Sequence, residues 1–395
     1  MIKVLHVTTT FNAAGGAEGN LARLVCNMDK TRFSNAIVAM SRRFQVPERV
    51  KQEGIPCTSL RMRPALSSLV ALVRLLRIVR QARPHILQTW MYHADLVGLL
   101  AGKLTGVPVI AWNIRCSLME TPSRWSSALV RRALIPLSGI PEVVIANSQS
   151  GLQAHQALGY RPRAWIWIPN SVDLDRFRPR VAARAALRAE LAVASDVALI
   201  GLVARFKPMK DHANFISATR LLIAENAKVH FVLAGHEIDL SDARLASLIE
   251  STGARERFHV LGLRQDIHQV TAGLDIACSS SAYGEGSSNA VAEAMACAVP
   301  CVATDVGDSA LIVGDTGKIV PARNSRALAQ GLSEILALSP RQRLALGHRA
   351  RERICERFSL PTIVDRYQRL YESLAAKPTV AADFGLQQSP REIKL

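Results

Sequence analysis

The sequence predicts an α/β protein made of two Rossmann-like domains, each built on a parallel sheet. Short apolar runs alternate with helical patterns along the 395 residues, which is typical of βαβ units. The pattern starts again in the second half of the chain, and a single core rarely grows beyond about 250 to 300 residues. Pattern and length therefore both favour two domains.

The first domain is expected at residues 1–168, with strands at 2–9, 35–40, 85–90, 107–112 and 143–147. A helix is expected between Pro64 and Pro84. It has one apolar stripe, and a second stripe with arginines spaced by three, at positions 74, 77, 80 and 83. This pattern favours an ordinary crossover helix with a solvated basic face, and contact with a membrane surface is the alternative.

The second domain is expected at residues 169–358, after a break at Pro169 and Asn170. Its strands are expected at 198–204, 229–234, 258–261, 276–279, 301–304 and 318–320, and residues 326–357 are expected to form two helices. A further helix at 359–375 is expected to pack back toward the first domain. Residues 376–395 lack periodicity and are predicted to be a disordered tail.

Charge is unevenly distributed along the chain. The net charge is +17, and residues 1–170 hold 21 Lys and Arg against 7 Asp and Glu, while the remainder holds 28 against 25. No helix-turn-helix, zinc or RNA-binding pattern accompanies the positive charge, so nucleic acid is not the expected partner. An acidic acceptor or an anionic membrane surface explains the charge equally well.

The expected location is the cytoplasm, with peripheral attachment to the inner face of the cell membrane as a variant. No apolar stretch reaches the roughly 18 residues that a spanning helix needs, and the N-terminus has the pattern of a strand rather than a signal peptide. Seven scattered cysteines without a CxxC pair argue against a disulfide framework or a zinc site.

Two cations follow the first expected strand of the second domain. Arg205 directly follows the strand at 198–204, and Lys210 lies five residues further on. Open α/β sheets bind ligands at the carboxyl ends of their strands. An arginine fork and a lysine point charge suit a diphosphate and could stabilise it as a leaving group without a metal. Two isolated basic residues would more simply be a solvated surface pair.

A second pattern indicates that this pair is not isolated. Residues 281–289 read SAYGEGSSN after another expected strand, with a helix at 290–298. Gly284 and Gly286 let a ligand approach the backbone, and Ser287 or Ser288 can cap the helix, whose free amides face an anion. Glu285 in the loop and Glu293 two turns into the helix are candidate ligands for sugar and ribose hydroxyls. For Glu293 alone, a surface glutamate on an amphipathic helix is the simpler interpretation.

The loop after the first strand contains a glycine pair. Gly15 and Gly16 allow main-chain amides to reach a phosphate, although a tight strand-to-helix turn would need the same residues. The loop lacks the GxGxxG dinucleotide pattern.

Together these motifs resemble the retaining family 4 glycosyltransferases of the GT-B fold over residues 1–375. The matching segments are GGAE at 15–18, RFKPMK at 205–210 and EGSSNAVAEAMACAVPCVATDVGD at 285–308, together with the passage from Asn147 to Pro179. The resemblance implies transfer of a sugar from a nucleotide-diphosphate sugar to a glycan or lipid-linked acceptor, in cell-surface polysaccharide or glycolipid biosynthesis. It implies retention of configuration, no metal and no cofactor. The donor is expected in the second domain and the acceptor in the first, with closure of the cleft between them completing the site.

The resemblance also implies roles for individual residues. Arg205 and Lys210 bind the donor diphosphate, Glu285 contacts the transferred sugar and Glu293 holds the ribose. The remaining donor-binding positions are Gly15 and Gly16 at the phosphate, main chain near Arg264 at the base, and Gly286, Ser288 and Asn289 at the helix start.

The sequence departs from the family pattern at three positions. Arg115 stands where a histidine is frequent, so either Arg115 or His93 is expected near the reacting carbon; a lone histidine is more often structural. Ser171 and Ala298 replace glycines. The Asp173-Leu174-Asp175 triplet resembles a metal-binding DxD motif but falls in the expected linker.

Two other functions stay open from the sequence. A nucleotide-sugar epimerase of the same fold would bind the diphosphate without an acceptor, and a non-catalytic module would keep the fold alone. Glu285 together with Arg205 and Lys210 argues against the module.

Overall fold

The computed structural model describes residues 1–12, 16–42, 44–62, 67–115, 117, 125–225 and 228–376. The chain divides into two compact units. Unit 1 holds residues 1–170 and the segment that begins at Leu360, and unit 2 holds residues 171–359. From the sequence, the first domain was expected to end at residue 168 and the second at residue 358. Residues 377–395, for which a disordered tail is predicted, lie outside the described residues.

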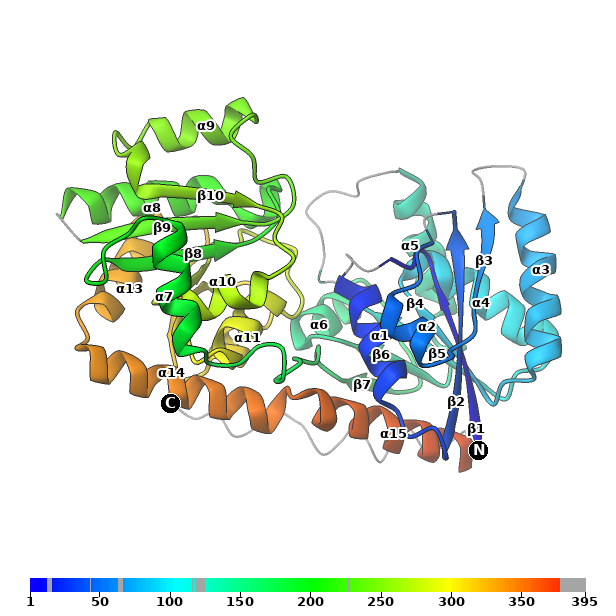
Figure 1. Cartoon of the computed structure of the whole chain (residues 1–395). Helices are drawn as coiled ribbons and strands as arrows, with labels where there is room; N and C mark the ends of the chain where they lie inside the picture. Colours follow the sequence, from blue (N-terminus) through cyan, green and yellow to red (C-terminus); the bar gives the residue numbers. More distant parts are fainter. Residues whose placement is uncertain are drawn as a thin grey trace. The chain divides into compact units, whose positions relative to one another are not determined.

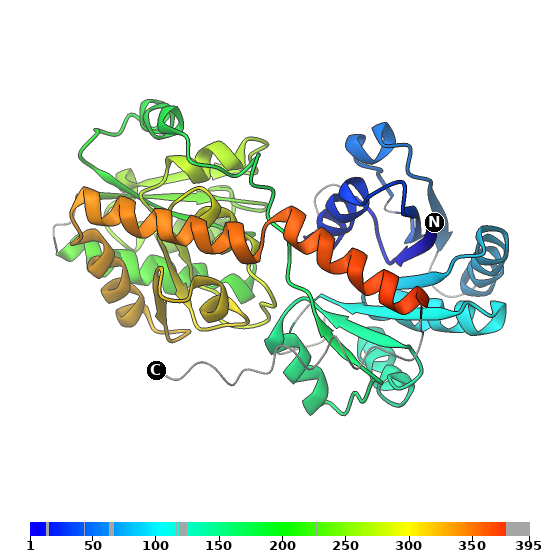
Figure 2. The ribbon, with the colours of Figure 1, turned by 90° about the horizontal axis from the view of Figure 1, so that it is seen from below.

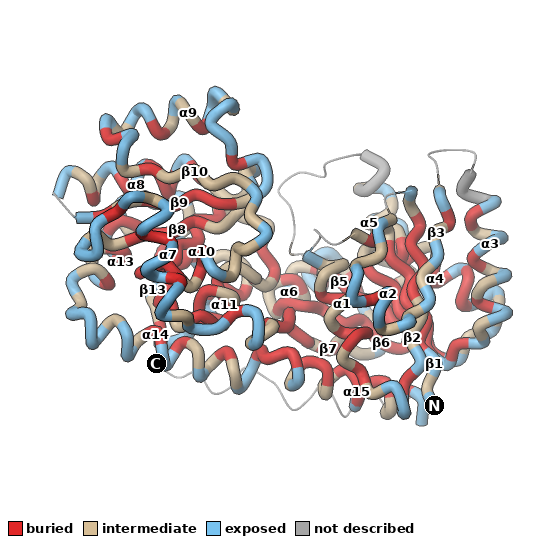
Figure 3. Tube along the Cα trace, in the orientation of Figure 1, coloured by how far each residue is buried: buried red, intermediate tan, exposed pale blue. Residues whose placement is uncertain are grey.

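Unit 1 is built on a parallel sheet of seven strands in the order β3-β2-β1-β4-β5-β6-β7. The strands are β1 (Ile2–Thr8), β2 (Phe33–Ser41), β3 (Cys57–Met62), β4 (Ile86–Trp90), β5 (Val109–Ile114), β6 (Val143–Ala146) and β7 (Trp165–Trp167). The central strands are buried along nearly their whole length, which is why they read as continuous apolar runs (Figure 3).

Helices cover both faces of this sheet. They are α1 (Gly16–Asn27), α2 (Glu48–Gln52), α3 (Ser67–Ala82), α4 (Tyr92–Thr105), α5 (Trp125–Leu137), α6 (Gln149–Ala157) and α15 (Leu360–Ala376). On one face α15 packs against α1, β1 and β4 (Figure 1). Its aromatic residues Tyr367 and Tyr371 join the apolar core. The other face is covered by α3 and α4.

Unit 2 repeats the plan with a parallel sheet of six strands in the order β10-β9-β8-β11-β12-β13. These are β8 (Ala198–Val203), β9 (Val229–Ala234), β10 (Phe258–Gly262), β11 (Ile276–Ser279), β12 (Cys301–Thr304) and β13 (Lys318–Val320). The two parallel sheets confirm the predicted fold class. All six strands were predicted from the sequence to within a residue at either end.

Two layers of helices enclose the sheet of unit 2 (Figure 2). One layer has α8 (His212–Ala224), α9 (Ala243–Glu250) and α13 (Ser325–Leu336). The other has α7 (Val181–Glu190), α10 (Ile267–Gly273), α11 (Asn289–Ala296), α12 (Ser309–Val313) and α14 (Pro340–Arg357). Two short 3-10 turns, η1 (Pro208–Lys210) and η2 (Arg255–Arg257), complete the unit. Within the described residues, no helix combines the length and apolarity needed to cross a bilayer.

Two glycine replacements differ in their backbone requirement. Ala298 adopts φ 58°, a left-handed conformation that favours glycine. This backbone conformation explains why the family pattern has glycine at this position. Ser171 is not among the described residues with positive φ, so its replacement of glycine carries no comparable strain.

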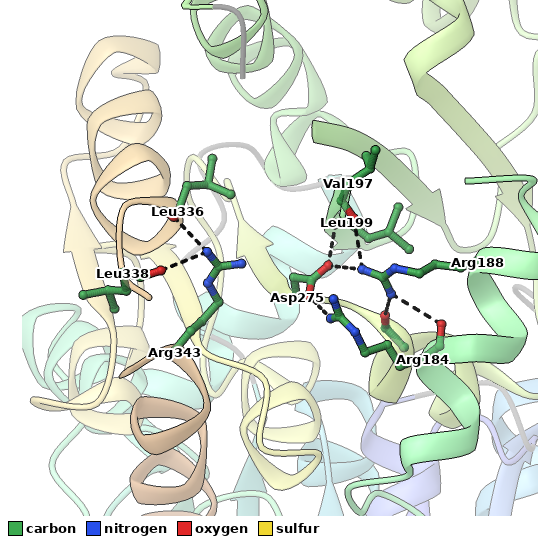
Figure 4. Close-up of polar contacts among 9 residues, drawn as sticks. Arg184, Arg188, Val197, Leu199, Asp275, Leu336, Leu338 and Arg343 are labelled. Atoms are coloured by element: carbon green, nitrogen blue, oxygen red, sulfur yellow. Dashed lines mark hydrogen bonds and ion pairs between the residues drawn. The ribbon is translucent and has the colours of Figure 1, made fainter. Parts of the chain in front are cut away.

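A buried ion cluster lies at the amino end of the second sheet, next to the start of β11 (Figure 4). The carboxylate of Asp275 pairs with Arg184 and Arg188 and accepts the Leu199 amide at 2.7 Å. The Arg188 guanidinium also donates to the carbonyls of Gly273 at 3.3 Å and Val197 at 3.1 Å. A buried charge needs such partners because desolvation is costly. The cluster connects α7 to β8 and β11 at the amino ends of these two strands.

Candidate active site

The chain turns sharply after β8 and begins α8 directly behind Lys210. Arg205 lies two residues beyond the strand, η1 ends at Lys210, and Asp211 adopts φ 48° as the N-cap of α8. The Asp211 side chain accepts the Asn214 amide at 3.1 Å. Aspartate tolerates the left-handed region and caps helices, so this residue stabilises a reversal that brings Lys210 to the carboxyl edge of the sheet.

The loop after β8 is bonded to the loop after β11, because these two strands are neighbours in the sheet. The Ser280 hydroxyl donates to the Lys210 carbonyl at 2.8 Å, and the Ala282 amide donates to the Met209 carbonyl at 2.9 Å. These bonds fix the backbone on both sides of the candidate diphosphate site.

The side chains of Lys210 and Glu285 meet between these loops. The Lys210 ammonium forms an ion pair with Glu285 Oε1, and the Ser281 hydroxyl donates to the same oxygen at 2.8 Å. The side chains of Lys210 and Glu285 are only 17% and 9% exposed, so the pair is shielded from solvent more than a surface salt bridge. Two candidates that the sequence predicts for one site are therefore in direct contact.

The loop around Glu285 depends on glycines for its close packing. Gly284 has φ 73°. Gly307, which follows β12, has φ 65°, and a Cβ atom there would lie 2.5 Å from the Gly286 carbonyl oxygen. The Asp308 amide donates to that same carbonyl at 2.8 Å. The loops after β11 and β12 are thus held against each other by backbone contacts.

The start of α11 differs from the expected capping. Ser288 occupies the N-cap position, one of the two positions expected, but its side chain forms no capping hydrogen bond. Asn289 is the first helical residue, and Glu293 lies half-buried on the next turn. The backbone dihedral angles of Ser288, rather than its hydroxyl, start the helix. The Ser288 hydroxyl therefore accepts no hydrogen bond from the amides of the first turn of α11.

Arg205 and Arg264 differ in how far their side chains are already engaged. Arg205 is exposed, and within the described residues no hydrogen bond or ion pair engages its guanidinium, although the charge of Glu237 acts on it. The Arg264 guanidinium binds Asp266 at 2.7 and 2.8 Å and Glu190 at 3.2 Å, and these bonds hold its pKa above the usual value. The predicted role of Arg264 concerned its main chain, which follows the carboxyl end of β10.

In unit 1, the glycine loop is described only from Gly16 onward, and Gly15 lies outside the described residues. Gly16 is exposed and begins α1. Glu18, in the first turn of α1, accepts a hydrogen bond from the Thr10 hydroxyl. A carboxylate is favourable at a helix N-terminus, so Glu18 stabilises the start of α1 beside the loop.

His93 and Asp95 lie in the first turn of α4, at the carboxyl end of β4. His93 is half-buried, and burial lowers its pKa. Within the described part of the chain its ring has no hydrogen bond. Asp95 is buried, accepts the Thr89 hydroxyl at 2.5 Å, and has its pKa raised to about 7 by burial. Burial therefore favours the neutral form of both side chains.

Arg115, the other candidate near the reacting carbon, belongs to an interior polar network. Its Nη2 donates to Asn170 Oδ1 at 2.5 Å, and its guanidinium lies 5.1 Å from the centroid of the Trp90 ring. It also hydrogen-bonds Tyr367 of α15, and burial lowers the pKa of the guanidinium. Asn147 donates to the same Asn170 oxygen at 3.2 Å. These contacts give Arg115 a defined structural role within unit 1.

Sequence reasoning missed several members of these networks. Ser281 belongs to the 281–289 loop, and the signal for its role is its position two residues after β11, at the carboxyl edge of the sheet. Tyr367 gave no such signal, because it contacts Asn113 and Arg115 from a helix more than 250 positions away.

The triplet at 173–175 forms a turn. Asp173 Oδ1 accepts the amides of Asp175 at 3.1 Å and Arg176 at 3.0 Å. Across the described ranges, no group of three His, Cys, Asp or Glu side chains is arranged to hold a metal ion.

Both halves of the sequence match glycosyltransferase families. Residues 14–176 match the family described as Glycosyltransferase Family 4, and residues 198–337 match the family described as Glycosyl transferases group 1.

Individual relatives have related names. The chain is 30% identical to D-inositol 3-phosphate glycosyltransferase of Saccharomonospora viridis, over 71% of this chain and 68% of that protein. It is 22% identical to UDP-Gal:alpha-D-GlcNAc-diphosphoundecaprenol alpha-1,3-galactosyltransferase of Escherichia coli, over 80% and 81%. The match to EpsF of Bacillus subtilis, at 28% identity, spans about half the length of that relative (53%).

The fold is also similar to solved structures. The Anabaena protein Alr3699/HepE, crystallised with UDP and glucose, superposes with a TM-score of 0.81 at 22% identity, over 95% of this chain and all of that one. At this identity the likeness concerns the fold.

Proposed function

This chain belongs to family 4 of the glycosyltransferases, group 1, and from that premise we propose that it moves a sugar from a nucleotide-diphosphate sugar to a glycan or lipid-linked acceptor. The observation that carries the proposal is the direct contact of Lys210 with Glu285 at the carboxyl edge of the second sheet. It joins a cation suited to a diphosphate with a carboxylate suited to sugar hydroxyls.

In this reaction the acceptor hydroxyl oxygen forms a bond to the anomeric carbon, and the bond from that carbon to the diphosphate oxygen breaks. The acceptor proton passes to the departing diphosphate. Lys210 and Arg205 stabilise the charge on that leaving group, which is the largest electrostatic demand of the reaction. Glu285 contacts the sugar, Glu293 the ribose, and the main chain of Gly286, Ser288, Asn289 and Arg264 the rest of the nucleotide. Gly16 approaches the phosphate.

We further propose retention of configuration through front-face attack, without a metal. His93 is the better candidate for the group near the reacting carbon. Its ring is half-buried and unengaged within the described residues, whereas the Arg115 guanidinium is already bound to Asn170 and Tyr367. The first-formed sugar anomer, followed by NMR, tests retention: inversion would exclude the front-face route. Activity that EDTA abolishes would exclude the metal-free route.

The acceptor is proposed to be anionic. Residues 1–170 hold 21 Lys and Arg against 7 Asp and Glu. Two relatives are named for acceptors that carry phosphate, an inositol phosphate and a diphospho-linked lipid. The same charge supports peripheral attachment to an anionic membrane surface.

The central test is binding of nucleoside diphosphates to the intact chain, measured by the shift of the melting temperature over a panel of bases. One or more bases should raise the melting temperature, and Lys210→Ala should remove most of that shift. Lys207→Ala is the matched control, because this exposed lysine of the same loop pairs with Glu237 instead. Equal losses in both variants, or no shift with any base, would contradict the proposal.

A nucleotide-sugar epimerase of the same fold is the second candidate. It makes a separate prediction, since it would consume the sugar nucleotide without any acceptor. Incubation of the donor alone, followed by chromatography of the products, separates the two activities.

A further inference from the structure

Unit 1 contains an open, basic groove at the edge of its sheet. The groove has a volume of about 830 Å³ and is lined by Arg42, Arg61 and Arg74 together with Phe44 and residues of β3. The three arginines come from three elements: the loop after β2, the edge strand β3 and helix α3. One charged residue on β3 would suffice to keep this edge strand from pairing with a strand of another molecule. The convergence of three arginines therefore requires another explanation.

The three guanidinium groups are not neutralised by the protein. All three side chains are exposed, and within the described residues none forms an ion pair or a side-chain hydrogen bond. Like charges in one groove repel each other, and an external anion would relieve this repulsion.

The carboxylates of the surrounding sequence are engaged elsewhere. Residues 1–115 contain five acidic residues, and each binds another partner. The pairs are Glu18 with Thr10, Asp29 with Thr31, Glu48 with Lys51, Glu53 with Lys30, and Asp95 with Thr89. No described carboxylate in this part of the chain is therefore left to occupy the groove.

The backbone of β3 is distorted where it presents Arg61. The register between β2 and β3 shifts between the pairs Ala39/Ser59 and Ser41/Met62, which leaves an extra residue on β3. Arg61 adopts φ 52° there, and its amide donates to the Ser59 hydroxyl at 3.1 Å. An arginine in the left-handed region is strained, and bulges re-aim side chains near functional sites. The bulge thus orients a guanidinium at the groove at a cost in stability.

We propose that this groove binds a phosphate group of an anionic ligand through Arg42, Arg61 and Arg74. Arginine forks match phosphate oxygens, and several converging forks bind more strongly than one. The ligand is either a small phosphorylated molecule or the headgroup of an anionic phospholipid. The binding itself does not depend on the proposed transfer reaction; only a role of the groove as part of the acceptor site would rest on that function.

The first arm of the test measures binding of inorganic pyrophosphate by calorimetry at low salt. It uses the full chain in the Arg205→Ala/Lys210→Ala background, so that neither cation of the candidate donor site contributes. Arg42→Gln/Arg74→Gln should weaken binding about tenfold. The matched control, Arg77→Gln/Arg80→Gln, removes the same charge from exposed positions of α3 outside the groove and should change it less than twofold.

The second arm measures sedimentation of the same variants with vesicles of phosphatidylglycerol or phosphatidylcholine. A groove-specific loss with pyrophosphate identifies a small phosphorylated ligand. A groove-specific loss only with phosphatidylglycerol vesicles identifies the lipid headgroup. Equal effects of the groove and control variants in both arms would overturn the site, because binding would then follow total charge alone.

Arg61→Gly supplies a check that does not depend on the paired substitutions. Glycine accepts the positive φ, so the melting temperature should stay the same or rise, while pyrophosphate or vesicle binding falls severalfold. A lower melting temperature with unchanged binding would show that Arg61 is structural and would contradict its part in the site. Failure of the groove leaves the effect of Lys210→Ala on nucleoside diphosphates unaffected, so the two proposals fail separately.

Discussion

The Lys210 ammonium forms an ion pair with the Glu285 carboxylate, although the two residues are 75 positions apart in the chain. The Ser281 hydroxyl donates to the same carboxylate oxygen. Since the ammonium is shielded and already paired, an incoming diphosphate has to compete with Glu285 for it. The contact therefore makes Glu285 an internal competitor of the ligand that Lys210 is proposed to bind.

Glu285→Gln should accordingly tighten the binding of a nucleoside diphosphate while it lowers sugar transfer. The substitution keeps an acceptor for Ser281 but frees the ammonium, so a larger fraction of molecules is ready to bind. We expect a dissociation constant about three- to tenfold lower by calorimetry. Glu334→Gln, which releases the exposed Lys318 at the start of β13 from its ion pair, should leave affinity unchanged. Weaker binding by Glu285→Gln would show that the carboxylate assists the diphosphate site.

Gly307→Ala should disrupt the candidate site through its backbone. The added Cβ would lie 2.5 Å from the Gly286 carbonyl oxygen, and moving that oxygen would disturb its hydrogen bond from the Asp308 amide. Gly253→Ala is the matched control, with φ 70° but open space around its Cβ position. Both variants pay the cost of the left-handed region, about 1 kcal/mol.

In chemical denaturation, Gly307→Ala should lose about 2 kcal/mol more than Gly253→Ala. It should also bind nucleoside diphosphates at least fivefold more weakly. The same stability loss in both variants would mean that the loop absorbs the clash.

Most strands that the sequence predicted are buried, although β10 and β13 are largely not, and the two that it missed have specific physical reasons. In β3, the segment from Cys57 to Met62 alternates poorly because its bulge interrupts the two-residue period. The strand β7 has three residues, of which only the middle one is buried, so no buried apolar run marks it, although the equally short β13 was predicted. Burial on both faces gives β4, β5 and β6 continuous apolar runs that are recognisable without an alignment.

The candidate site was predictable to a similar degree. Strand ends followed by glycine, serine and charged residues pointed to Lys210 and Glu285 separately, but their contact depends on β8 and β11 being neighbours. Strand order is set by packing over the whole sheet and leaves no local trace. The N-cap position of α11 was predictable, because serine is preferred there, but the sequence did not show that the Ser288 hydroxyl makes no capping hydrogen bond.

Asp275→Asn should destabilise unit 2 strongly, because it leaves the Arg188 guanidinium buried without a counter-charge. Removal of one partner of a buried ion pair costs about 3 to 5 kcal/mol. The comparison is Asp196→Asn, which breaks the exposed ion pair with Lys228 and should give no measurable change. Calorimetric unfolding of both variants decides the point, and a mild effect of Asp275→Asn would mean that water hydrates the Arg188 guanidinium in place of the lost carboxylate.

Asp95 should make the stability of unit 1 depend on pH. Burial raises the pKa of its carboxyl group from 3.8 to about 7, so between these two values the folded protein holds a proton that the unfolded chain has lost. The free energy of unfolding therefore falls as the pH rises through this window, and the contribution of Asp95 levels off above pH 7.

Asp95→Asn removes this dependence because the amide does not titrate. It can still accept the Thr89 hydroxyl. The difference in unfolding free energy between Asp95→Asn and the parent should shift in favour of the variant by about 4 kcal/mol between pH 4 and pH 8. Urea denaturation at several pH values measures this difference. Parallel curves would show that Asp95 stays charged in the folded state, which would require a partner for Asp95 Oδ2, an atom that has none within the described residues.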